Sequence, residues 1–200
     1  TPRSSSPSRR SEAPVSDRVL LIAGAVALGD TPRARQWAHM KIAETMAWLL
    51  DGDAPLLVHG GCTDPQRAHP RDNVDWWADD LARSARITRH IYMAKGPVWV
   101  CRPPTFRPES SRWKDGDAPD PKARNVQMVT AVSGALRAME KDLGVPATEL
   151  GHAVRVVGLR APWSQRNGTA HLLGRARRAQ LPRIDEHLCP EAYGPSEGES

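Results

Sequence analysis

The sequence predicts an α/β fold in which a doubly wound, mainly parallel sheet carries helices on both faces, as in Rossmann-like proteins. Three observations support this prediction. Short apolar runs typical of buried strands alternate with helical stripes, glycines follow the strand runs, and the length of 200 residues suits one domain of ordinary size. Because strands joined through helices run parallel, their carboxyl ends share one edge of the sheet, where ligands bind.

The first strand and helix are predicted from residue 18 onward. Residues 18–23 are an apolar run that ends at Gly24, which is typical of a buried strand. Thr31 and Pro32 follow as a helix N-cap and a first-turn proline. The helix is predicted to end near residues 51–52. It carries an apolar stripe at steps of three and four residues, made up of Trp37, Met40, Ala43, Ala47 and Leu50.

The middle of the chain is predicted to contain two more strands, one helix and a long loop. A second buried strand covers residues 56–58, and a helix with Val74, Trp77 and Leu81 on one face begins at Asp72. Residues 97–101 form a third strand. The proline-rich segment 102–121 has neither the helical nor the strand period, which is typical of loops that form lids or binding sites.

The carboxyl-terminal part is predicted to contain two helices and two strands. The first helix ends at Gly144 and carries the stripe Val129, Val132, Leu136, Met139 and Leu143. A strand over 154–159, a helix over 168–179 and a short strand over 182–185 follow. These elements form one domain over residues 18–188. Disordered tails are expected at 1–17 and 189–200, which contain too little apolar surface to become ordered.

Composition excludes several classes of protein. The net charge is +5, but the basic residues are spread along the chain, so nucleic acid is a possible partner and not the favoured one. The three cysteines have neither the spacing of a zinc site nor the density of a disulfide scaffold, so we expect no metal and a reducing, cytoplasmic environment. No stretch approaches the roughly 20 apolar residues that span a membrane, and no secretory signal is visible.

Three glycine-bearing or polar motifs lie where strands end or helices begin. His59-Gly60-Gly61 follows the second strand, and paired glycines let the backbone approach a ligand or simply turn. Arg124 and Asn125 lie in the first turn of the long helix, where Arg can clamp a phosphate, unless this is an ordinary solvated turn. Gly168-Thr169 opens the last helix, which either holds an anion or is simply capped.

A family resemblance follows from the order of these motifs over residues 17–185. The residues that carry it are Arg18-Val19-Leu20-Leu21-Ile22, Leu57-Val58-His59-Gly60-Gly61, Trp77-Ala78, Arg124-Asn125 with Met128, and Gly168-Thr169-Ala170-His171. In this order they resemble the SLOG superfamily, in particular its YspA-like branch. The resemblance implies a Rossmann-like fold, a pocket for a nucleotide or a nucleotide-derived ligand, and self-association into a homo-oligomer. The superfamily includes phosphoribohydrolases that activate cytokinins and DprA DNA-processing proteins.

The sequence departs from the family pattern in three places. Residues 24–26 read Gly-Ala-Val where the branch has Gly-Ser-Arg, so one expected ligand contact is missing. A longer loop through Pro65, Arg67, His69 and Pro70 replaces a Gly-Ala-Asp link, and either Asp72 or Asp75 stands in for its aspartate. The hydrolases have Glu three residues after the Gly-Thr pair, but this chain has Leu172 there, which cannot transfer a proton.

We therefore expect a nucleotide-binding or ADP-ribose-binding module that needs no other cofactor, and a ligand sensor is one role that fits it. In this interpretation Arg124 neutralises a phosphate and Asn125 contacts a sugar or base edge. The phosphate also receives hydrogen bonds from Gly60, Gly61, Gly168 and Thr169, and His171 belongs to the same expected site.

Two alternatives remain open. The first is a hydrolase of a nucleotide glycosidic or phosphate bond, with Asp72, Asp75 or His59 as the general base. The second is a DprA-like accessory protein for single-stranded DNA. It would bind through the basic residues Arg175, Arg177 and Arg178 and stack bases on Trp113.

Overall fold

The computed structural model describes residues 17–62, 69, 71–93, 98–104, 109–110, 121–165 and 168–195. In this part of the chain seven strands form one sheet in the order β5-β4-β3-β2-β1-β6-β7. The strands are β1 (Asp17–Gly24), β2 (Ala54–His59), β3 (Thr88–Tyr92), β4 (Val98–Cys101), β5 (Glu109–Ser110), β6 (Val154–Arg160) and β7 (Ile184–Leu188). The helices are α1 (Pro32–Leu50), α2 (Val74–Ser84), α3 (Pro121–Leu143) and α4 (Gly168–Arg178).

The sheet is mainly parallel, as the alternation of strands and helices predicts. The strands β1, β2, β3, β6 and β7 pair in parallel, while β4 and β5 extend the sheet beyond β3 in antiparallel pairs. From β1 the chain builds outward through β2 to β3, and α3 then returns it to β6 on the other side of β1. The strand order therefore reverses between β1 and β6, which is the switch point where such folds bind ligands.

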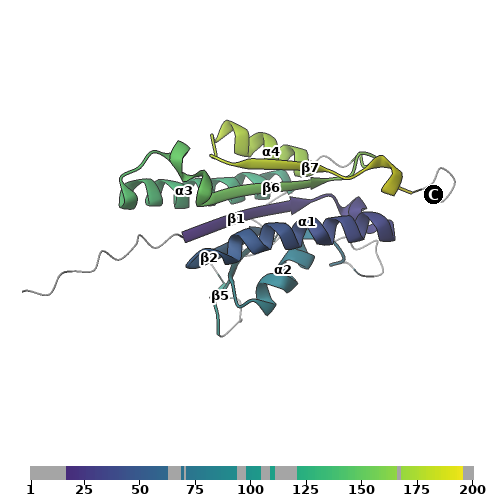
Figure 1. Ribbon diagram of the computed structural model, residues 1–200, viewed down its shortest axis with the longest axis horizontal. Coiled ribbons are helices and arrows are strands. Elements are labelled where there is room, and N and C mark those ends of the chain that lie inside the picture. The colour runs from purple at the N-terminus through teal and green to yellow at the C-terminus, as the bar shows by residue number, and fades with distance from the viewer. Residues whose placement is uncertain are drawn as a thin grey trace, which may run out of the picture.

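Helices cover both faces of the sheet (Figure 1). The helices α1 and α2 lie on one face and α3 and α4 on the other. Strand β1 shows why both faces are covered, because its side chains alternate between two apolar clusters. Leu20 and Ile22 pack with α1 and α2, whereas Val19 and Leu21 pack with α3 and α4.

The buried face of α1 differs from the predicted stripe. Trp37 is buried, but Met40 is 52% exposed and Leu50 is 49% exposed. The residues that α1 buries are Ala34, Trp37, Ala38, Ile42, Thr45, Met46 and Leu49. The predicted stripe and the buried residues both recur at steps of three and four. Periodicity alone therefore does not show which face of α1 packs against the sheet. The predicted N-cap is confirmed, because the Thr31 hydroxyl accepts a hydrogen bond from the Ala34 amide at 3.2 Å.

Strand β3 was not predicted, and the strand expected over 97–101 is the fourth of the chain and antiparallel. The sequence of β3 is Thr-Arg-His-Ile-Tyr, in which polar residues hide the apolar pattern. Arg89 is nevertheless only 3% exposed, and its charge is neutralised by Asp79 of α2. A buried ion pair of this kind cannot be seen in hydrophobic periodicity.

The folded part of the chain extends past residue 188, where the sequence places the start of a tail. Cys189 is 1% exposed and belongs to the core on the α1 side of the sheet. A short helical turn, η3 (Glu191–Tyr193), follows, and the Tyr193 carbonyl oxygen accepts a hydrogen bond from the Thr31 hydroxyl. Residues 1–16 and 196–200, which make up the rest of the two predicted tails, lie outside the described residues.

Candidate functional site

A cleft of about 310 Å³ opens at the carboxyl edge of the sheet, beside the switch point. It is bounded by the segments that follow β1 and β2 and by the first turns of α2, α3 and α4. The lining residues are Ala23, Gly24, Ala25, Val26, Gly60, Cys62, Asp75, Pro121, Arg124, Asn125, Met128, Gly168 and Thr169. The volume is near the lower end of the roughly 300–1,000 Å³ that small-molecule pockets occupy.

Arg124 is the cation of the cleft. It extends from the first turn of α3 to the end of β2, where its Nη1 donates a hydrogen bond to the Gly60 carbonyl oxygen at 3.0 Å. Arg124 is only 8% exposed, and its Nε is buried without a hydrogen-bond partner among the described residues. A buried donor without a partner is unfavourable, so this group is poised to bind an acceptor.

Gly60 lets Arg124 approach the backbone. A Cβ atom added to Gly60 would lie 2.9 Å from Cζ and 3.0 Å from Nε of Arg124, and 3.1 Å from Oδ2 of Asp75. Both charged groups therefore lie over the space that a side chain at this position would fill. Only glycine allows this arrangement without displacing one of them.

Asp75 is the anion of the cleft and comes from the first turn of α2. The residue is 4% exposed, and its Oδ2 accepts a hydrogen bond from the Cys62 amide at 3.0 Å. Asn73 caps the same helix by accepting from the Asp75 amide, and its own amide group donates to the Cys62 carbonyl oxygen at 2.8 Å. These contacts hold the backbone after β2 against the start of α2.

Asn125 joins the starts of α3 and α4. Its Nδ2 donates to the Gly168 carbonyl oxygen at 2.9 Å and lies 3.4 Å from Nδ1 of His171. Asn125 is 2% exposed and Thr169 is 7% exposed, so the polar groups at this end of the cleft are almost entirely enclosed.

The electrostatic character of the cleft favours a ligand that carries negative charge. The first turns of α3 and α4 contain no acidic residue and line the cleft, so the partial positive charge at the start of both helices lies beside it. Arg124 adds a full positive charge, while Asp75 provides a separate acceptor on the opposite helix. The cleft can thus bind an anion beside Arg124 and a hydroxyl or amine donor beside Asp75, and both side chains approach the same point above Gly60.

His59 lies beside the cleft and does not line it. It is 0% exposed, its Nδ1 accepts from the Gly61 amide at 3.2 Å, and its Nε2 lies 3.1 Å from Oδ1 of Asp79. Because Nδ1 accepts, the proton resides on Nε2 and is donated to Asp79. Both ring nitrogens and the Gly61 amide are therefore used within the protein, and they support the backbone turn at Gly61, where φ is +53°.

Asp79 completes this buried network. It also binds Arg89, whose Nη1 is 2.8 Å from Oδ1 and 2.6 Å from Oδ2. Burial alone would raise the pKa of Asp79, but the hydrogen bond from His59 together with the Arg89 guanidinium outweighs it and holds the pKa below its ordinary value.

Asp72 lies away from the cleft, between α1 and α2. It forms an ion pair with Arg35, and its Oδ1 accepts from Trp77 Nε1 at 2.9 Å. Of the three residues that the sequence proposes as general bases, Asp75 therefore lines the cleft, while His59 and Asp72 are engaged elsewhere.

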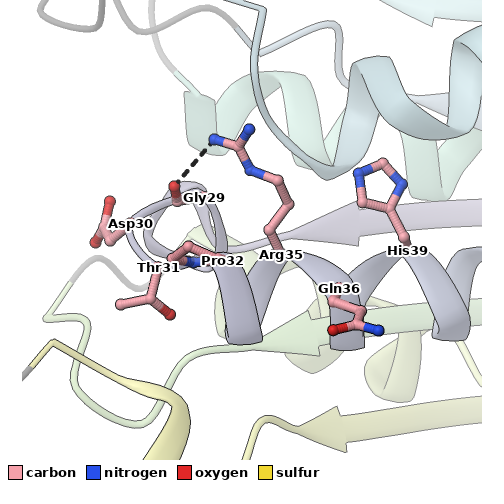
Figure 2. Close-up of a pocket in the computed structure, with 7 residues that line it drawn as sticks. All are labelled: Gly29, Asp30, Thr31, Pro32, Arg35, Gln36 and His39. Atoms are coloured by element: carbon pink, nitrogen blue, oxygen red, sulfur yellow. Dashed lines mark hydrogen bonds between the residues drawn. The ribbon is translucent and has the colours of Figure 1, made fainter.

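A larger hollow, of about 570 Å³, lies at the start of α1 (Figure 2). Arg35 and His39 project from the same side of the helix, and an Arg35 nitrogen donates to the Gly29 carbonyl oxygen at 3.3 Å. Arg35 is also paired with Asp72, and His39 stacks on Trp77 with 4.6 Å between ring centroids. Arg35 and His39 are thus held by other residues of the protein, so we regard the smaller cleft as the functional site.

The cleft contains six of the ten residues proposed from the sequence: Gly60, Asp75, Arg124, Asn125, Gly168 and Thr169. His171 contacts Asn125 from behind the cleft, and Gly61, His59 and Asp72 lie as described above. Sequence reasoning missed Cys62 and Pro121, because the sequence shows no pattern at either position. Trp113, the proposed base-stacking residue, lies outside the described residues.

No family model matches the chain, and no curated protein and no solved structure is similar to it. None of the helices within the described ranges combines the length and the apolar character needed to cross a membrane. In the same part of the chain, no group of three or more His, Cys, Asp or Glu side chains is placed to hold a metal ion. The geometry of the cleft is therefore the basis for assigning a function.

Proposed function

We propose that the chain is a nucleotide-binding protein of the SLOG type that holds one phosphate-bearing ligand, such as a nucleotide or an ADP-ribose-like molecule, in the cleft at the carboxyl ends of β1 and β2. The buried, partly unpartnered guanidinium of Arg124 is the observation that supports this most strongly. It lies at the switch point of the sheet, where Rossmann-like folds bind nucleotides.

In this proposal the phosphate binds between Arg124 and the first turn of α4. The Arg124 guanidinium and the backbone amides at the start of α4 donate to the phosphate oxygens. Asp75 accepts from ribose hydroxyls, which is a common role for an acidic residue near a bound nucleotide. Val26 and Met128 supply apolar surface for the base.

A hydrolase is the second candidate. Asp75 lines the cleft, so it is a better candidate for the general base than His59 or Asp72, which are engaged elsewhere. A carboxylate in the cleft beside a bound nucleotide can accept a proton from an attacking water molecule. The Asp75→Asn variant separates the two functions. Phosphate-dependent ligand binding should remain measurable in this variant in either case. If the protein is an enzyme, the original protein forms product from a nucleotide and the variant does not.

Thermal denaturation with a panel of ligands tests the proposal. AMP, ADP, ATP, NAD and ADP-ribose are compared with adenosine, which has the same base and sugar but no phosphate. We expect a concentration-dependent rise in Tm for at least one phosphate-bearing ligand and a much smaller rise for adenosine. If none of the phosphate-bearing ligands raises Tm above the adenosine value, the proposal is wrong.

The Arg124→Ala variant assigns the effect to the cleft. A charge-assisted hydrogen bond contributes about 1.5–3 kcal/mol, so the dissociation constant is expected to rise about 10- to 100-fold. Arg33→Ala is the matched control, because Arg33 is an exposed residue on α1 outside the cleft. Equal affinities of the two variants would contradict the role of Arg124.

A further inference from the structure

A second basic site lies on the outer surface, in a groove of about 290 Å³ between α3 and α4. The helix α3 contributes Val126, Val129, Thr130, Ser133 and Arg137, and α4 with the residue after it contributes Arg175, Arg178 and Ala179. Both helices begin at the cleft, and these arginines lie toward their far ends. We call Arg137, Arg175 and Arg178 the groove arginines.

The groove arginines differ from the other arginines near the end of the sheet. Arg160 and Arg177 share Glu186, each at 2.6 Å, and Arg155 and Arg183 share Asp185. Within the described ranges, by contrast, none of the groove arginines forms an ion pair with a carboxylate. Three positive charges gathered in one groove repel each other, so an anion that binds there relieves an unfavourable arrangement.

The groove walls provide more than charge. The Thr130 hydroxyl donates to the Val126 carbonyl oxygen at 2.9 Å, and the Ser133 hydroxyl donates to the Val129 carbonyl oxygen at 2.8 Å. The hydroxyl protons are therefore occupied, and their oxygens are left to accept hydrogen bonds. Val126 and Val129 add apolar surface beside them. This combination suits a ligand that has anionic groups, hydrogen-bond donors and flat apolar rings.

All three charges in the groove are guanidinium groups. Arginine binds phosphate through two parallel hydrogen bonds and also stacks on planar bases, which lysine does not do. A single strand exposes its bases for stacking on these guanidinium groups, whereas a duplex keeps its bases paired and stacked inside. We therefore favour a single strand over a duplex as the ligand.

We propose that the groove between α3 and α4 binds the phosphate backbone of single-stranded nucleic acid through the groove arginines. This site is separate from the nucleotide cleft and does not depend on it. Its contacts are mainly to phosphate, so binding is expected to depend weakly on base sequence and strongly on salt concentration.

Fluorescence anisotropy with a labelled 20-nucleotide oligo-dT tests this proposal, with titrations between 50 and 200 mM NaCl. The triple variant Arg137→Ala, Arg175→Ala and Arg178→Ala is expected to bind at least 10-fold more weakly than the original protein. With about 0.7 counterions released for each phosphate contact, the slope of log Kd against log salt concentration should fall by about two. The same three positions changed to Gln keep more of the side-chain packing and should give the same result.

The control variant removes the same charge from exposed positions outside both sites: Arg33→Ala, Arg83→Ala and Arg86→Gln. Binding close to that of the original protein is expected for this control. The groove variant should in turn keep the nucleotide-dependent rise in Tm, so each proposal can fail alone.

Several outcomes would overturn the groove proposal. They are no binding of oligo-dT by the original protein, equal weakening in the groove and control variants, and tighter binding of a duplex of the same length. Binding of poly-glutamate as tightly as oligo-dT would also overturn it, because the groove would then be a general site for acidic chains.

Discussion

The guanidinium group of Arg124 lies against the backbone of Gly60, with Nη1 donating to the Gly60 carbonyl oxygen at 3.0 Å. This contact joins the start of α3 to the end of β2, which are far apart in the sequence. It fixes a positive charge at the carboxyl edge of the sheet, beside the cleft in which we propose that an anion binds.

The Gly60→Ala substitution is expected to displace Arg124 and weaken nucleotide binding. The new Cβ atom would lie 2.9 Å from Arg124 Cζ and 3.1 Å from Asp75 Oδ2, so at least one of these side chains must move. Crowding of this kind costs about 1–3 kcal/mol of stability. Isothermal titration with the best ligand of the panel measures the loss of affinity. Gly134→Ala is the control outside the cleft, because a Cβ there meets nothing within 4 Å; equal losses in both variants would contradict the geometry.

Alanine substitutions at Gly24 and Gly134 are expected to have opposite effects on stability. A Cβ atom on Gly24 would lie 2.2 Å from Cγ2 of Val74, where α2 packs against the end of β1, so Gly24→Ala should lower the free energy of unfolding by about 1–3 kcal/mol or more. On Gly134, inside α3, a Cβ meets nothing within 4 Å, so Gly134→Ala should raise it by about 0.4–1 kcal/mol. Urea denaturation at pH 7 measures both, and changes of the same sign would contradict this packing.

The buried Asp79 should make the protein sensitive to acid. Its pKa is held below the ordinary value in the folded state, so the unfolded chain binds the proton more tightly. The contribution of Asp79 is therefore complete above its ordinary pKa near 4 and is lost as the pH falls through the folded-state pKa. In the Asp79→Asn variant, the free energy of unfolding should be about 3–5 kcal/mol lower at pH 7 and should depend less on acidification.

Asp80→Asn is the matched control for Asp79, because Asp80 pairs with Arg83 at the surface, where both side chains are more than half exposed. Urea denaturation at several pH values between 7 and 3 compares the two variants. A loss for Asp79→Asn no larger than for Asp80→Asn would show that the buried network contributes little.

The three cysteines should differ in reactivity. Burial raises the pKa of Cys189 to about 11 and also raises the pKa of Cys101, so both thiols are protonated and shielded at pH 8. Cys62 is partly exposed and lines the cleft. Reaction with a chromogenic disulfide at pH 8 should therefore show one fast thiol, which disappears in Cys62→Ser and slows when a nucleotide binds. Fast reaction of Cys189, or no protection by a bound nucleotide, would contradict this account.

Much of the fold could be predicted because local signals agreed with it. Thr31 caps α1 as expected, Gly144 ends α3 with a φ of +67°, and the apolar runs of β1 and β6 are adjacent strands of the parallel sheet. Strand β3 could not be predicted, because the charge of Arg89 is neutralised by Asp79, a partner on a different element. The choice between two apolar faces of α1 likewise depends on tertiary packing.

The candidate site could be predicted only in part. Glycines and an arginine at the expected strand and helix ends identified Gly60, Arg124 and Gly168, because topology alone brings these ends together. The sequence did not decide between Asp72 and Asp75. That choice depends on Arg35, which pairs with Asp72 from α1 and leaves Asp75 as the carboxylate in the cleft.

A crystal structure of the protein with the best nucleotide of the panel tests the central claim most directly. The account predicts that a phosphate oxygen lies within about 3.2 Å of an Arg124 nitrogen and faces the first backbone amides of α4. A phosphate bound instead beside Arg35 at the start of α1, with the cleft between Gly60 and Thr169 empty, would contradict it.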